Sequence, residues 1–184
     1  MQIAARRNLG FTLTELMMSL AVLAILMATA MPAFGNLVQS SQEQTARSAL
    51  SAALGTARIA AVSRTSNVVV CPSPDQQYCG RTTEWQHGWL VFVDADHDGL
   101  RDASEELLEA AQAQPDGVAI LSSTGRTRVN YQPDGSSPGT NITLTVCDGR
   151  GADRATALII NNAGRVRSGT PSAAAATACV NAIR

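Results

Sequence analysis

The sequence contains no lysine, so all 14 of its basic residues are arginine. Aromatic residues make up only 4% of the 184 residues, and the hydrophobic share of 45% therefore rests on alanine and aliphatic side chains. The formal net charge of −1 by itself predicts no polyanionic partner. This length allows one domain together with a membrane anchor.

Catalytic and metal-site motifs are also missing. None of the four cysteines forms a CxxC pair, and neither His87 nor His97 stands close to a cysteine in sequence, so zinc spacing is absent. The sequence has no nucleophile elbow and no P-loop. We therefore expect a chain that is not an enzyme, that holds no cofactor apart from a calcium candidate described below, and that does not power its own movement.

The charges that are present are segregated along the chain. Residues 1–74 carry five arginines against two acids, and residues 75–116 carry two arginines against ten acids. Residues 117–184 carry seven arginines against three acids. The C-terminal third is thus the cationic part of the chain, and the middle is acidic.

The N-terminal part holds a long apolar run. Between Phe11 and Phe34, which are 24 residues, the only charge is Glu15. As a helix this run is roughly 36 Å long, enough to span a bilayer core. Arg6 and Arg7 precede the run and predict a cytoplasmic N-terminus. A cleaved secretory peptide, with its site in "MATAMPA", is the alternative, but its apolar core does not usually begin with a charge.

The stretch "LGFTLTELM" resembles the processing site of type IV pilins and pseudopilins. The resemblance implies that prepilin peptidase cuts after Gly10 and that Phe11 is then methylated. Glu15 falls on the family's glutamate and Pro32 on its helix-kinking proline, whereas Thr14 replaces the commoner isoleucine or valine. It further implies that residues 1–10 are a leader and that residues 11–34 become the core helix of a filament.

Glu15 has two interpretations. Its carboxylate reaches the headgroup region, or it pairs with the amino group of Phe11 on a neighbouring subunit. An unpaired carboxylate in an apolar filament core is costly, so the second interpretation makes charge matching set the register of the subunits.

Residues 35–65 predict an amphipathic helix that continues the first one, from about residue 12 to 63, with a kink or loosening near residues 28–32. Its apolar positions follow three- and four-residue steps: Leu50, Ala53, Leu54, Ala57, Ala61 and Val62.

After Thr65 the apolar period changes to two, which is typical of strands. The predicted strands are 67–71, 88–95, 117–122, 128–132, 141–147 and 156–161. Pro115–Gly117, Pro133–Gly135 and Asn162–Gly164 predict turns. The low-complexity stretch 168–178 predicts a mobile loop tied down by Cys179.

The four cysteines are Cys71, Cys79, Cys147 and Cys179. An even number beside an export signal favours two disulfides outside the cytoplasm. Three connectivities are possible. We prefer the pairs that are close in sequence, and four buried free thiols are the alternative.

The pattern "GWLVFVDAD…DGLRDASEELL", followed by "LTVCD…ALIINNAGRVR", resembles the GspH/FimT group of pilins, which includes type II secretion pseudopilins and minor pilins. The implied fold is α+β: a long N-terminal helix whose second half packs on an antiparallel β-sheet. Residues 66–184 then form an extracytoplasmic β-rich domain.

Residues 94–105 fit the calcium-loop pattern D-x-D-x-D-G-x5-E. Asp94, Asp96 and Asp98 provide carboxylates, Leu100 a backbone carbonyl and Glu105 a bidentate carboxylate, with Gly99 at the sharp turn. Arg101 stands where such loops bury an apolar side chain. A solvated acidic loop between two strands is the alternative interpretation.

The arginines of the last third predict a cationic surface. Arg165 and Arg167 lie two apart after Gly164, which closes a hairpin, and residues i and i+2 of a strand share a face. Arg126 with Arg128 repeats this spacing, and Arg150 and Arg154 occupy a nearby loop. Guanidinium groups bind phosphate bidentately. With Tyr131 as the only neighbouring aromatic, base stacking contributes little.

The Gly-Arg-x-Arg signature also resembles the DNA-binding motif of FimT-type minor pilins that act in natural transformation. We therefore expect a minor pilin of the pilus tip or priming complex that binds double-stranded DNA without sequence preference for uptake during competence. The alternative is an assembly pilin or type II secretion pseudopilin without a DNA role. The expected partners are other pilin subunits, prepilin peptidase and DNA, with the inner membrane as the site before assembly in the extracellular pilus.

Overall fold

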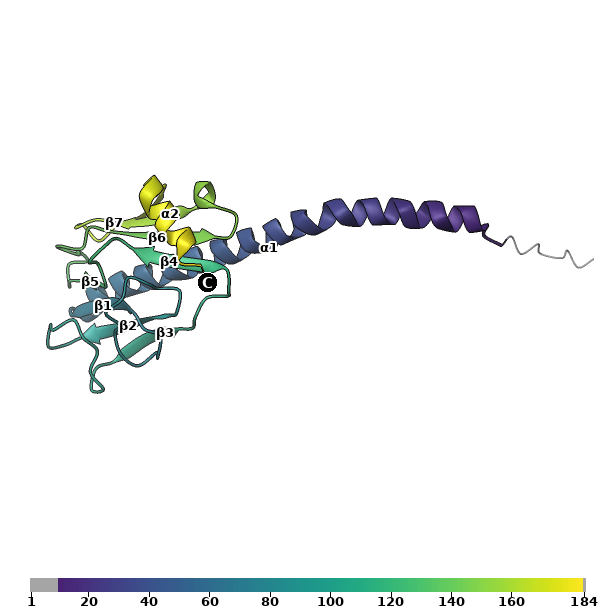
Figure 1. Cartoon of the computed structure of the whole chain (residues 1–184). Coiled ribbons are helices and arrows are strands. Elements are labelled where there is room, and N and C mark those ends of the chain that lie inside the picture. Colours follow the sequence, from purple (N-terminus) through teal and green to yellow (C-terminus); the bar gives the residue numbers. More distant parts are fainter. Residues whose placement is uncertain (1–9, 184) are drawn as a thin grey trace, which may run out of the picture. The chain divides into compact units, whose positions relative to one another are not determined.

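The computed structural model describes residues 10–183. The expected leader residues 1–9, including Arg6 and Arg7, lie outside this range. The chain forms two compact units, Met1–Val38 and Gln39–Arg184, and helix α1 belongs to both (Figure 1).

Helix α1 extends over Leu13–Arg64, which confirms the single long helix expected from the sequence. It remains helical through residues 28–32, so the loosening expected there does not interrupt it. Large apolar side chains in its first part are exposed, among them Leu13, Met18 and Met31 at 71–75%. No helix within residues 10–183 combines the length and apolar character needed to cross a membrane.

The second half of α1 supplies one side of the protein core. Five of the six positions of the predicted apolar stripe are fully buried, and Ala46 joins them one turn earlier. Val62 is the exception and is 51% exposed. It follows the buried Ala61 directly, and one residue turns a helix by about 100°, which carries Val62 away from the core.

The strands form two antiparallel four-stranded sheets, where the sequence predicted a single sheet. Sheet 1 has the order β3-β2-β1-β5, with bounds β1 Asn67–Pro72, β2 Trp89–Asp94, β3 Leu107–Ala111 and β5 Val129–Tyr131. Sheet 2 has the order β4-β6-β7-β8, with bounds β4 Val118–Ser122, β6 Ile142–Asp148, β7 Thr156–Ile160 and β8 Val166–Gly169. Each predicted strand forms close to its predicted bounds, but strand period does not reveal which strands pair.

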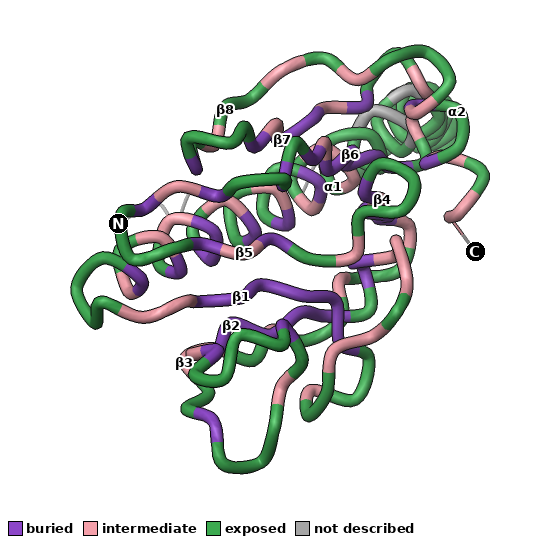
Figure 2. The backbone as a smooth tube through the Cα atoms, turned by 90° about the vertical axis from the view of Figure 1, so that its left-hand side faces the viewer, coloured by how far each residue is buried: buried purple, intermediate pink, exposed green. Residues whose placement is uncertain are grey.

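Apolar side chains from α1 and from both sheets meet in one central cluster, which includes Leu50, Trp89, Tyr131, Leu144 and Leu158. A second, smaller cluster lies on the other face of sheet 1, around Cys71 and Phe92. Because both faces of β1 and β2 are covered, their residues are buried almost without alternation, as the colours of Figure 2 show.

Residues 168–178 do not form the mobile loop that the sequence predicted. They contain the end of β8 and most of helix α2, Ala173–Asn181 (Figure 1). The side chain of Ser172 accepts a hydrogen bond from the Ala175 N–H at 3.2 Å and caps the helix. Alanine has the highest helix propensity, and this capped alanine run is therefore a helix rather than a flexible segment.

Two disulfides join Cys71 to Cys79 and Cys147 to Cys179, which are the pairs preferred from the sequence. The second disulfide connects α2 to β6, where Ala119, Ala155 and Ala176 pack around it. Both disulfides, all three apolar clusters and both sheets belong to the unit Gln39–Arg184, which thus has a core of its own.

Candidate functional site

The start of α1 is closed by a reciprocal pair of contacts between Thr12 and Glu15. The Thr12 N–H donates to a Glu15 carboxylate oxygen at 3.0 Å, and the Glu15 N–H donates to the Thr12 hydroxyl at 3.3 Å. This is a capping box, which satisfies two of the free N–H groups at the helix start. The sequence analysis missed this role, although "TLTE" has the required T-x-x-E spacing.

Gly10 and Phe11 stand before the first turn of α1, outside any helix or strand. Both are exposed, and Phe11 is 91% exposed. The peptide bond at which processing is expected therefore joins two exposed residues outside regular secondary structure.

The turn between β7 and β8 carries the Gly-Arg-x-Arg signature. The Gly164 N–H donates to the Asn161 carbonyl at 2.8 Å, and the Arg165 N–H donates to the Asn161 side chain at 3.1 Å. Gly164 closes the turn with a φ of 69°, as the sequence predicted. We call residues 161–167 the arginine hairpin.

Neighbouring segments hold the arginine hairpin in place. Arg58 of α1 donates to the Gly135 carbonyl at 2.9 Å and to the Ala163 carbonyl at 3.4 Å, which ties two turns together. A Cβ atom on Gly164 would overlap the Gly135 carbonyl and lie 3.2 Å from the Tyr131 ring. Glycine is therefore required at position 164 both by backbone conformation and by close packing.

Arg165 and Arg167 are both exposed. Val166 between them is partly buried against the central core, so the strand alternation directs the two arginines away from it. Among residues 10–183, neither guanidinium has an ion pair or a side-chain hydrogen bond. Within that range these are two unengaged cations: Arg165 directly precedes β8, Val166–Gly169, and Arg167 is on this edge strand of sheet 2.

The other four predicted arginines are engaged with the protein. Arg126 donates to the Gly139 carbonyl at 2.6 Å, and Arg128 donates to the Gly99 carbonyl at 2.5 Å. Both precede β5 and are not on a strand, so the expected repeat of the Arg165–Arg167 geometry is wrong. The Val129–Tyr131 strand is too short to include them.

Arg150 and Arg154 pair with acids that are close in sequence. Arg150 contacts Asp148 at 2.7–3.0 Å, and this side-chain hydrogen bond raises the pKa of Arg150. Arg154 lies 3.6 Å from Asp153. Both arginines precede β7, whereas the arginine hairpin follows it. The five residues of β7 span roughly 17 Å between the two turns. The six arginines therefore do not form one surface.

The calcium-pattern residues are on the β2–β3 connection. Asp94, Asp96 and Asp98 each place one oxygen within 4.8 Å of one oxygen from each of the others. Glu105 is not in that group, and its two oxygens instead accept the N–H groups of Ala95 and Asp102. Burial raises the pKa of Asp94, and the nearby carboxylates of Glu105, Asp96 and Asp98 raise it further.

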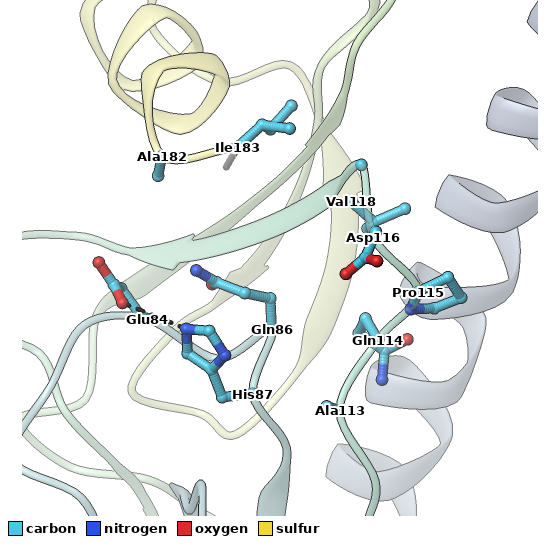
Figure 3. Close-up of a pocket in the computed structure, with 11 residues that line it drawn as sticks. Glu84, Gln86, His87, Ala113, Gln114, Pro115, Asp116, Val118, Ala182 and Ile183 are labelled. Carbon is cyan, nitrogen blue, oxygen red and sulfur yellow. Dashed lines mark ion pairs between the residues drawn. The ribbon is translucent and has the colours of Figure 1, made fainter.

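A cavity beside the end of α2 is lined by Glu84, Gln86, His87, Asp116 and Ile183, among others (Figure 3). His87 is exposed and lies 3.4 Å from Glu84. No serine, cysteine or lysine is among the lining residues. The cavity therefore offers a histidine–carboxylate pair without a nucleophile to activate.

The fold defines the chain as a type IV pilin-like protein. Two crystal structures of the type IV minor pilin FimU from Pseudomonas aeruginosa strain PAO1 resemble it at 21% and 20% identity, with TM-scores of 0.57 and 0.53. They cover 73% and 68% of this chain, and 91% of each FimU chain. A comparison with curated protein sequences gives no match.

The model of the family "Type II transport protein GspH" matches residues 46–164, and the prokaryotic N-terminal methylation motif matches residues 5–31. The chain belongs to the GspH family, the GspH/FimT group of type IV pilins and pseudopilins, whose members are structural proteins. The family match ends at Gly164, directly before Arg165.

Proposed function

We propose that this chain is a minor type IV pilin whose arginine hairpin binds double-stranded DNA without sequence preference, for DNA uptake in natural transformation. The observation that carries the proposal is the pair of exposed guanidinium groups of Arg165 and Arg167 in the braced arginine hairpin, which have no partner among residues 10–183. Phosphate contacts of this kind give affinity that depends on salt and not on sequence.

The other four predicted arginines have secondary roles at most in this proposal, and Arg154 is paired with Asp153. Arg126 is bound to the loop of residues 137–140, whose Ser137 N–H donates to the Asn162 carbonyl of the arginine hairpin. Of these arginines, Arg126 is therefore the best placed to bind DNA beside the arginine hairpin. Arg128 faces the acidic connection, and Arg150 is neutralised by Asp148.

The proposal includes the N-terminal life cycle of a pilin. Residues 11–34 first hold the chain in the inner membrane with its N-terminus in the cytoplasm and its domain outside. Prepilin peptidase then removes residues 1–10 and Phe11 is methylated, and the helix enters the pilus beside other pilin subunits. The methylation-motif match and the exposed apolar side chains of α1, which require a cover, support this sequence of events.

The test is DNA binding by the unit 39–184 across a salt series. We expect Arg165→Gln with Arg167→Gln to weaken binding roughly tenfold or more. The slope of log affinity against log salt concentration should fall by about 2, since each lost phosphate contact contributes about 0.9. Gel shift or fluorescence anisotropy with duplexes of unrelated sequence measures both quantities.

Arg64→Gln with Arg81→Gln is the matched control. It removes the same charge from two exposed arginines outside the arginine hairpin. The control should bind almost as well as the wild type, and circular dichroism should show all three proteins folded. Equal weakening in both double variants would mean that net charge alone acts, and the proposal would fail.

A second candidate function is an assembly pilin or type II secretion pseudopilin with no DNA role. The description of the matched family, a type II transport protein, favours it. Arginines on the edge strand β8 would then serve only to block pairing with other strands. Neighbouring genes for secretion rather than for a pilus would support this candidate.

A further inference from the structure

The connection between β2 and β3, residues 94–105, contains a group of carboxylates that the proposed function does not use. We call it the acidic loop. One oxygen each of Asp94, Asp96 and Asp98 lies within 4.8 Å of the others. No ion pair among residues 10–183 neutralises any of the three. Like charges at this spacing repel each other unless a cation lies between them.

Asp94 gives an independent indication of a missing partner. The residue is completely buried at 0% exposure, and its Oδ1 accepts the Gly99 N–H at 3.3 Å. Its Oδ2 is inaccessible to solvent and has no hydrogen-bond partner among the described residues. A buried carboxylate oxygen without a partner is costly, and an ion bound by the three aspartates would supply one.

The carboxylates of the loop also accept backbone N–H groups of the loop itself, although those of Asp96 and Asp98 are exposed. Asp96 Oδ1 accepts the Asp98 N–H at 3.2 Å, and Asp98 Oδ1 accepts the Leu100 N–H at 2.6 Å. Glu105 accepts the Ala95 N–H at 2.9 Å and the Asp102 N–H at 3.0 Å, and so closes the loop end on its start.

Two arginines at the loop bind backbone carbonyl groups, and neither forms an ion pair with a carboxylate of the loop. Arg128 donates to the carbonyl of Gly99, and Arg101 donates to the carbonyl of Gln77 at 2.7 Å. These contacts fasten the loop to the residue before β5 and to the segment closed by the Cys71–Cys79 disulfide. The position of the loop is thus fixed while its charge remains unbalanced.

We propose that the acidic loop binds one calcium ion through the carboxylates of Asp94, Asp96 and Asp98, with Glu105 as a positioning residue. Carboxylate oxygens on a short loop with water completing the shell suit calcium. The group contains no histidine or cysteine, which zinc would prefer. Magnesium demands stricter octahedral geometry and gives up its waters reluctantly. This inference does not depend on DNA binding.

The test uses the full chain in detergent micelles, stripped with a chelator and then titrated with calcium chloride alone. We expect calorimetry to show one site with Kd of roughly 10⁻⁴–10⁻³ M, as in extracellular modules. At a calcium concentration tenfold above Kd the Tm should rise by about 3–6 °C. Magnesium chloride at the same concentration should produce a clearly smaller shift.

Asp96→Asn and Asp94→Asn test the ligands, and Asp102→Asn is the charge-matched control in the same loop. Asp96→Asn should weaken calcium binding by roughly tenfold or more, because it removes an exposed ligand charge. Asp94→Asn should lose the calcium-dependent rise in Tm while remaining folded without calcium. Asp102→Asn should respond like the wild type.

A folded wild-type chain with no heat and no Tm shift at 10 mM calcium, a concentration of roughly ten times the upper Kd, would overturn the proposal. So would an equal response to magnesium, or equal calcium affinity in the wild type and Asp96→Asn. Should Asp94→Asn fail to fold, the wild-type and Asp96→Asn titrations decide the matter on their own.

Discussion

At the residue scale, the arginine hairpin depends on a few contacts made beneath it. Tyr131 is fully buried next to Gly164, and its hydroxyl has no hydrogen-bond partner among the described residues. Arg58 reaches the same place from α1 and holds the Gly135 and Ala163 carbonyls. The exposed arginines thus stand on a packed base rather than on a flexible loop, which reduces the entropy lost when they bind a ligand.

Burial raises the pKa of Tyr131 to about 12, against an ordinary value of 10.0, although the charge of Arg58 opposes the shift. Between these pH values only the unfolded chain ionises at this tyrosine, so unfolding is favoured as the pH rises. We expect the free energy of unfolding to fall by roughly 2–3 kcal/mol from pH 10 to 12. Denaturant titrations in this range, made before the disulfides react with base, measure the slope.

Tyr131→Phe should remove that part of the pH dependence while the protein remains folded. The tyrosinate absorbance of Tyr131, taken as the difference between the wild type and Tyr131→Phe, should rise only near pH 12. A rise of this difference absorbance near pH 10 would contradict the expectation.

At the element scale, α2 needs its disulfide more than a longer helix would. It has nine residues, and a helix of this length is marginal by itself even when it is rich in alanine. Only Ala176 and Cys179 of the helix are buried. The link from Cys179 to Cys147 on β6 therefore does much of the docking, and it closes 32 residues of chain that include β7 and the arginine hairpin.

We expect Cys147→Ala with Cys179→Ala to lower the free energy of unfolding by about 3–4 kcal/mol, from the chain entropy of a loop of this length. Cys71→Ala with Cys79→Ala removes a disulfide whose cysteines are only 8 residues apart, and it should lower the free energy of unfolding by about 2–3 kcal/mol. Urea unfolding of the unit 39–184 compares the two pairs. A larger loss from the shorter loop would show that native packing, rather than chain entropy, sets the order.

At the scale of the whole molecule, Glu15 connects the fold to assembly. Within one chain it completes a capping box with Thr12, and in the filament we propose that its charge also pairs with the Phe11 amino group of a neighbour. The two roles use the same carboxylate but differ in what they require of it. The cap needs an acceptor oxygen, whereas the pair needs a negative charge.

Glu15→Gln separates these roles, because glutamine retains an acceptor oxygen and loses the charge. We expect both Glu15→Gln and Glu15→Ala to reduce incorporation into pili strongly, measured as the amount of this subunit in sheared fibres. Membrane levels of the subunit serve as the control for expression. Normal incorporation of Glu15→Gln would mean that the capping box alone accounts for this residue.

The sequence by itself determined the features that local signals specify. The helix of residues 13–64, six of the eight described strands and the turns at Gly117, Gly135 and Gly164 follow from apolar period and from residues that tolerate a positive φ, whereas β3 and β8 are not among the predicted strands. The pilin processing motif is likewise local, since its residues stand within one short stretch. Local signals were misleading for α2, because its capped alanine run resembles a low-complexity loop.

Only the tertiary structure decided which charges remain available. It separated the strands into two sheets, bound Arg128 to Gly99 across 29 residues, and left Arg165 and Arg167 without a side-chain partner among residues 10–183. It also buried Asp94 with one oxygen unpartnered, which no spacing of aspartates reveals. Period and propensity act over a few residues, whereas the partner and the burial of a charge depend on segments far apart in the chain.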